Sequence, residues 1–114
     1  MSIPQAGSFP PDAAAAIGRA SERLLPSLIE FRRDLHRQPE TARQEIRTTS
    51  AVLRRLAEAG LNPQPFRKTG LLCDLGPTVE EAGWPRLALR ADLDALPVPD
   101  RTGTPWRSAK EGTA

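Results

Sequence analysis

Two carboxylates near the end of the sequence, Asp92 and Asp94, have the residue type and the spacing that could do chemistry. They lie in an apolar stretch, residues 87–96, that is typical of a buried β-strand. Side chains two positions apart in a strand point to the same face, about 6.5–7 Å apart along it. Two neighbouring acids cost free energy unless a cation, a hydrogen-bond donor or water compensates them. The pair therefore predicts the wall of an active site or of a metal site.

Two other interpretations of this pair stay open at the level of sequence. Aspartate is common where a strand gives way to a turn, so the pair could simply begin a turn before Pro97. Arg90 lies on the same alternating face and could neutralise Asp92, which would make the cluster a structural ion pair. Spacing alone does not separate these hypotheses.

The chain has one histidine, His36, and one cysteine, Cys73. Catalytic zinc sites need several protein ligands, so these two residues cannot assemble the usual imidazole-rich site by themselves. We interpret His36 as a cation at a helix C-terminus, where it suits the helix dipole, and Cys73 as a small buried residue. No metal ligand is predicted from the sequence.

Composition excludes several classes of protein. The 114 residues are 39% hydrophobic and include 12 Pro and 8 Gly, so the chain is at most one domain with a modest core. The net charge is +2, and acids are interspersed among the arginines of residues 30–58, which favours a solvated helical face over a nucleic-acid-binding surface. A single cysteine, no signal peptide and no membrane-spanning run predict a cytoplasmic protein.

Helical periodicity marks two segments that must position the acidic strand. A short helix over residues 13–17, weakened by Gly18, is followed by an apolar stripe over residues 21–36 that ends before Pro39. A second helix is predicted from Thr41, where Thr41 and Gln44 fit a capping box, to Gly60. Its predicted buried side is made of Ile46, Val52, Leu53, Leu56 and Ala57.

Short strands are predicted at residues 66–68 and 71–75, then a loop over residues 76–85 and the strand that carries the two acids. This order of elements predicts an α/β fold in which two helices pack on an incomplete mixed sheet. In open α/β sheets, ligands bind beyond the carboxyl ends of the strands, which is where Asp92 and Asp94 lie.

Three separated motifs resemble one known family. Residues 31–40 resemble the opening helix of the metal-dependent amidohydrolases that include hippurate hydrolase, N-acyl-amino-acid amidohydrolase and auxin-conjugate hydrolase, within the zinc aminoacylase and carboxypeptidase superfamily. Residues 89–97 look like the acidic strand of that family, and residues 104–112 look like the segment that follows it. The resemblance spans residues 24–114 in the right order.

The resemblance implies the N-terminal part of a catalytic domain with a two-metal centre, Zn or Mn, that hydrolyses the amide bond of small N-acyl amino acids. In the family, a Cys–Gly–His–Asp segment comes after the stretch that matches residues 104–112 and supplies the first metal ligands. It also implies that residues 21–114 form a partial domain truncated before that segment, while residues 1–20 are expected to be largely disordered. Homo-oligomers are expected only with the missing lid domain.

The resemblance gives Asp94 and Asp92 supporting roles only. Asp94 matches the aspartate that sits behind a metal ligand in related enzymes, so it is expected to orient other ligands. Asp92 occupies the position where those relatives place a ligand histidine, and it is expected to contribute negative charge or to pair with Arg90. The chain has no counterpart of the ligating Cys and His residues or of the general-base glutamate.

Three hypotheses of function follow. The chain is a fragment of an amidohydrolase that is inactive alone, or a non-enzymatic interaction module derived from that fold whose exposed sheet edges dock another chain. Nucleic-acid binding through the arginine-bearing helices is the least favoured. The sequence does not decide whether the chain is itself an enzyme, and neither a nucleic acid nor a membrane is expected as its partner.

Overall fold

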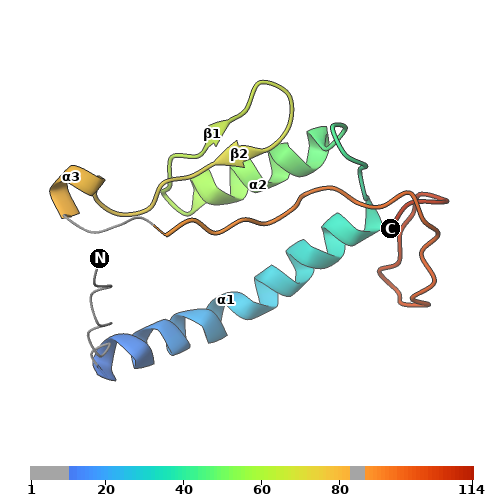
Figure 1. Ribbon diagram of the computed structural model, residues 1–114. Coiled ribbons are helices and arrows are strands. Elements are labelled where there is room, and N and C mark those ends of the chain that lie inside the picture. The colour runs from blue at the N-terminus through green and yellow to red at the C-terminus, as the bar shows by residue number, and fades with distance from the viewer. Residues whose placement is uncertain (1–10, 83–86) are drawn as a thin grey trace, which may run out of the picture. The chain divides into compact units, whose positions relative to one another are not determined.

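A computed structural model describes residues 11–82 and 87–114 (Figure 1). The chain divides into two compact units, Met1–Asp34 and Leu35–Ala114. The first unit consists, in its described part, of most of helix α1 (Pro11–Arg37). The second unit contains the end of α1 and all the other elements, and it includes every residue that the sequence marks as a candidate for chemistry.

Helix α1 is one continuous helix rather than the two that the sequence predicts. Residues 11–20, which we expected to be largely disordered, form its first turns, and residues 1–10 lie outside the described residues. Alanines after Asp12 are the strongest helix formers and carry the helix past Gly18. Pro26 lies inside the helix rather than in a first turn, so one backbone hydrogen bond is missing there.

Helix α2 (Ile46–Glu58) begins later than the predicted start at Thr41. The predicted capping box is wrong: the Gln44 N–H donates to the backbone oxygen of Thr41 at 3.0 Å, which closes a turn. Arg43, with a φ of 66°, cannot belong to a helix. The predicted buried side is also wrong, because the buried residues are Thr48, Thr49 and Ala51.

The C-terminus of α2 confirms the predicted role of Gly60. Its φ of 79° is the left-handed conformation that glycine adopts without strain. The N–H of Gly60 donates to the backbone oxygen of Ala57 at 2.9 Å, and the N–H of Leu61 donates to that of Leu56 at 3.1 Å. These two bonds satisfy the last carbonyls of the helix.

Strands β1 (Gln64–Pro65) and β2 (Leu71–Leu72) form an antiparallel hairpin with Gln64 opposite Leu72. The first strand lies slightly before its predicted position. The hairpin lies along α2 in Figure 1, and the Gly70 N–H donates to the hydroxyl of Thr49 at 2.9 Å. The α/β class is confirmed, with a two-stranded sheet among the described residues.

A short helix, α3 (Val79–Ala82), occupies part of the predicted loop. A true capping arrangement is found here, because the Thr78 hydroxyl accepts the Glu81 N–H at 3.3 Å and the Glu81 carboxylate accepts the Thr78 N–H at 2.8 Å. Residues 83–86 of that predicted loop lie outside the described residues.

The predicted buried strand at residues 87–96 is the largest difference from expectation. In the part of the chain that the structure describes, only Ala95 forms a bridge, parallel to Thr41. Leu87 is 87% exposed and Leu89 is 91% exposed. A strand needs a hydrogen-bonded neighbour, and no described segment pairs with residues 87–94.

None of the helices in the described ranges combines the length and the apolar content that crossing a lipid bilayer requires.

Candidate functional site

The residues that follow the two aspartates are tied to the end of α1 and the loop after it. The Ala95 N–H donates to the backbone oxygen of Glu40 at 2.8 Å, beside the bridge to Thr41. Leu96 and Ala114 exchange backbone hydrogen bonds of 2.7 and 3.0 Å. These contacts fix where the acidic segment ends, so they also fix the position of the candidate site relative to α2.

The Glu40 carboxylate caps α2. Its two oxygens accept the N–H groups of Arg47 at 3.1 Å and of Thr48 at 2.7 Å, which a helix N-terminus otherwise leaves without partners. Burial raises the pKa of Glu40, but the N–H groups of Thr48 and Arg47 lower it by more, so its pKa lies below the usual range. Glu40 therefore holds the loop, α2 and the acidic segment together through both its side chain and its carbonyl.

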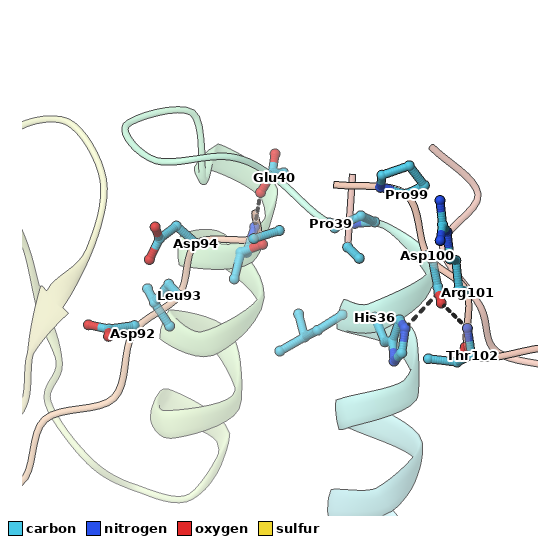
Figure 2. Close-up of a pocket in the computed structure, with 14 residues that line it drawn as sticks. His36, Pro39, Glu40, Asp92, Leu93, Asp94, Pro99, Asp100, Arg101 and Thr102 are labelled. Carbon is cyan, nitrogen blue, oxygen red and sulfur yellow. Dashed lines mark hydrogen bonds and ion pairs between the residues drawn. The ribbon is translucent and has the colours of Figure 1, made fainter. Parts of the chain in front are cut away.

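Asp100 organises the loop that follows the acidic segment, as Figure 2 shows. Its carboxylate accepts the N–H groups of Thr102 at 2.8 Å and of Ser108 at 2.7 Å, and its side chain is only 4% exposed. The Ser108 and Thr102 N–H groups are the main reason that the pKa of Asp100 lies far below its usual range. An aspartate with this pKa is ionised at neutral pH.

His36 is the third partner of Asp100. Its Nε2 lies 2.9 Å from Oδ2 of Asp100, and because an ionised carboxylate can only accept, the proton between them belongs to the imidazole. The predicted position of His36 in the last turn of α1 is confirmed. The carboxylate that it binds, 64 positions away in sequence, had no signal in the spacing.

Asp92 and Asp94 border two hollows. One, of about 470 Å³, is also lined by His36, Glu40 and Asp100. The other, of about 460 Å³, lies toward the β1–β2 hairpin and is also lined by Glu45, Thr69 and Leu72. Residues 92–94 line both hollows, so this segment separates one from the other.

The two aspartates point to the same side of the segment in Figure 2, as their spacing predicts. Asp92 accepts hydrogen bonds from Nε of Arg90 at 3.0 Å and from its Nη2 at 2.8 Å, so the structural ion pair that the sequence left open is present. Both partners are largely exposed. No partner is found for Asp94 among the described residues, and its side chain is exposed.

Glu45 is a residue that the sequence analysis placed on a solvated helical face, and this prediction is wrong. It is 8% exposed, and its Oε2 has no hydrogen-bond partner in the described part of the chain. Its own backbone N–H and the hydroxyl of Thr69 lower the pKa of Glu45 below its usual range. The same face was predicted for Glu40, which instead caps α2. Their position before the apolar run of α2 was the available signal.

The donor groups do not fit a metal centre by themselves. Within residues 11–82 and 87–114, no three His, Cys, Asp or Glu side chains come close enough together to hold a metal ion. Cys73 is partly exposed and lies on neither hollow. The residues that this chain brings together can bind one another, position a loop and present two carboxylates, but they do not form a cation cage.

No protein-family model matches the chain, but curated proteins and a solved structure are similar to it. N-acetyl-L-cysteine deacetylase of Bacillus subtilis is 41% identical over 90 residues, which cover 78% of this chain and 21% of that protein. N-acetyldiaminopimelate deacetylase of Halalkalibacterium halodurans is 39% identical over 94 residues, 78% of this chain and 24% of that protein.

A protein of Rhodococcus jostii named putative glutamate–cysteine ligase 2-3 is 48% identical over 88 residues, but these are only 11% of its length. The crystal structure of the Bacillus subtilis YXEP protein, titled a dinuclear metal binding peptidase from the M20 family, superposes with a TM-score of 0.68 at 34% identity. The match covers 81% of this chain and 25% of that one. The chain thus spans about a quarter or less of the length of the relatives it matches.

Proposed function

This chain belongs to the family of the N-acetyl amino acid deacetylases and the M20 dinuclear metal peptidases, and from that premise we propose that it forms the N-terminal part of an amidohydrolase catalytic domain. The observation that carries the proposal is the similarity over about four fifths of the chain, including the segment with Asp92 and Asp94 bordering two hollows. The reaction is hydrolysis of the amide bond of a small N-acyl amino acid.

Within that domain, we assign this chain's residues supporting roles. Asp94 is exposed and has no partner in the described structure, so its carboxylate is available to accept a hydrogen bond from a group that holds a divalent metal, Zn or Mn. Asp92 contributes negative charge that Arg90 partly offsets. Glu40 and Asp100 fix the segment between them by hydrogen bonds to the loops on both sides of it.

Because the chain's own donors do not form a metal site, we propose that the 114-residue chain alone hydrolyses nothing. The metal-binding groups and the general base belong to other parts of the fold. A homo-oligomer forms only when a lid domain is present, and the single cysteine favours a cytoplasmic location.

A chimera tests the proposal. The segment of Bacillus subtilis N-acetyl-L-cysteine deacetylase that this chain matches is replaced, within one polypeptide, by the corresponding residues of this chain. The chimera is expected to release acetate from N-acetylcysteine when Zn²⁺ or Mn²⁺ is supplied. In the chimera, Asp94→Asn should lower kcat/KM about 10–100-fold.

The control in the same chimera is Glu58→Gln, which alters an exposed carboxylate at the end of α2 and should leave kcat/KM unchanged. A folded chimera without deacetylase activity would count against the proposed function. Full activity of the Asp94→Asn chimera would remove the assigned role of Asp94.

A second candidate function, a non-enzymatic interaction module, is favoured by one observation: Leu87 and Leu89 are almost fully exposed. A folded but inactive chimera, together with a stable complex between the 114-residue chain and another polypeptide, would favour this alternative.

A further inference from the structure

The second unit buries little apolar surface of its own. Among the described residues, Ala51 is the only buried hydrophobic residue, and no side chain is fully buried. Large apolar side chains of the hairpin and of the acidic segment are instead more than half exposed; they are Phe66, Leu72, Leu75, Leu87, Leu89 and Leu96. Contiguous exposed apolar surface of this kind marks an interaction site.

Residues 87–94 are the most open part of this surface. They carry the two most exposed leucines, and within the described residues their backbone makes no hydrogen bond to another segment. A strand with unpaired N–H and C=O groups is a template for pairing with another strand. Hollows of about 470 and 460 Å³ flank its end, so space is available on two sides.

The segment is anchored at one end. Ala95 is bridged in parallel to Thr41, and its N–H donates to the backbone oxygen of Glu40 at 2.8 Å. Glu40 is itself held by the N-terminus of α2. The anchor gives residues 87–94 a fixed starting point and direction, which reduces the entropy lost when a partner strand pairs with them.

The length of the relatives indicates what covers this surface. In the deacetylases and in the M20 peptidase, the matched region belongs to a polypeptide of which it is only 21–25%. The remaining three quarters or more of those proteins have no counterpart in this sequence. They are therefore the source of strands whose apolar side chains could cover Leu87 and Leu89.

We propose that residues 87–94 are a docking strand that pairs, without a covalent link, with a separate polypeptide carrying the remaining strands of a deacetylase of this family. The inference rests on the proposed function, because it takes the partner from that family. The partner contributes an unpaired strand edge and apolar side chains that cover Leu87 and Leu89. Its docking converts residues 87–94 from an open segment into a sheet strand.

The test uses the full 114-residue chain and the remainder of Bacillus subtilis N-acetyl-L-cysteine deacetylase, the protein without its 90 matched residues. The two polypeptides are co-expressed and also refolded together from urea. We expect a 1:1 complex by light scattering, and slower amide hydrogen exchange in residues 87–94 by at least about tenfold. The remainder should be soluble only when the chain is present.

Four variants separate strand pairing from general stickiness. Leu89→Lys should weaken the complex at least about tenfold, because it places a charge in the covered apolar surface. Ala88→Pro and Ala91→Pro remove N–H groups that point to opposite edges of a strand, so at least one should weaken the complex similarly. Ile17→Lys, the matched change at an exposed apolar residue of α1, should leave the affinity unchanged.

A complex that all three changes in residues 87–94 leave intact would overturn the proposal. So would a remainder that stays insoluble with the chain, or a chain that pairs with a second copy of itself through this segment. The covalent chimera keeps this result separate from the proposed function: an active chimera whose two halves do not associate retains the function and refutes only the docking strand.

Discussion

Two pairs of carboxylates in the second unit differ in almost every physical respect. Glu40 and Asp100 each accept two backbone N–H groups, and the Asp100 side chain is almost completely buried. Asp92 and Asp94 are exposed, and the one printed partner between them, Arg90, is exposed as well. The first pair stabilises the fold, whereas the second pair remains accessible to a ligand or another chain.

The difference teaches how the fold provides an accessible acidic segment. A carboxylate that binds backbone N–H groups is compensated in the free chain, and its geometry is fixed by the loops it joins. A carboxylate on an open segment is compensated by water, which a partner or a ligand can replace. Both pairs are acidic in sequence, and only the backbone groups around them separate their roles.

Acid should produce the largest effect, because it acts on both structural carboxylates together. The pKa values of Asp100 and Glu40 are lowered in the fold, so the stability they contribute is complete above about pH 4–5 and is lost as pH falls toward their folded pKa values. Amide hydrogen exchange in residues 95–110 should show loss of protection between pH 5 and about pH 3 after correction for the intrinsic rate. The double variant Glu40→Gln, Asp100→Asn should show a much weaker pH dependence, and an unchanged one would contradict the assignment.

Asp100→Asn alone should have the next largest effect. The change removes the charge that binds the N–H groups of Thr102 and Ser108 and the imidazole of His36. Amide protection at Thr102 and Ser108 should fall on the order of tenfold. The matched change Asp94→Asn, at the exposed carboxylate, should leave that protection as it is; equal effects of the two variants would erase the distinction between the pairs.

Glu40→Ala should cost about 1 kcal/mol of stability, as the loss of a helix cap does, because the N–H groups of Arg47 and Thr48 lose their acceptor. Thermal unfolding followed by circular dichroism at 222 nm measures this change. Thr41→Ala, which removes the hydroxyl that the sequence nominated as the cap, should stay within about 0.5 kcal/mol of the original chain. The reverse order of the two costs would show that Glu40 does not cap α2.

Arg90→Ala should have the smallest effect, less than about 0.5 kcal/mol, because it removes an ion pair whose partners are both largely in water. The same unfolding measurement applies. A cost well above 1 kcal/mol would mean that the Arg90–Asp92 pair belongs with the structural carboxylates rather than with the accessible ones.

Local sequence signals succeeded where the interaction lies within a few residues. Gly60 ends α2 as predicted, since the left-handed conformation favours glycine, and His36 lies in the last turn of its helix. The capping box at Thr78 and Glu81 has the same signature as the one assigned to Thr41 and Gln44, yet only the former forms. A signature of this kind states which bonds are possible, and the Glu40 carboxylate competes successfully for the start of α2.

The sequence by itself determined the α/β class, the family resemblance and the common face of Asp92 and Asp94, because these depend on residue order and on the two-residue period of an extended backbone. Only the tertiary structure decided that Glu40, Glu45 and Asp100 are withdrawn from solvent and that residues 87–94 are open. Burial and strand pairing depend on neighbours far away in sequence. The partner of His36 is one such neighbour, and the missing partner of residues 87–94 is another.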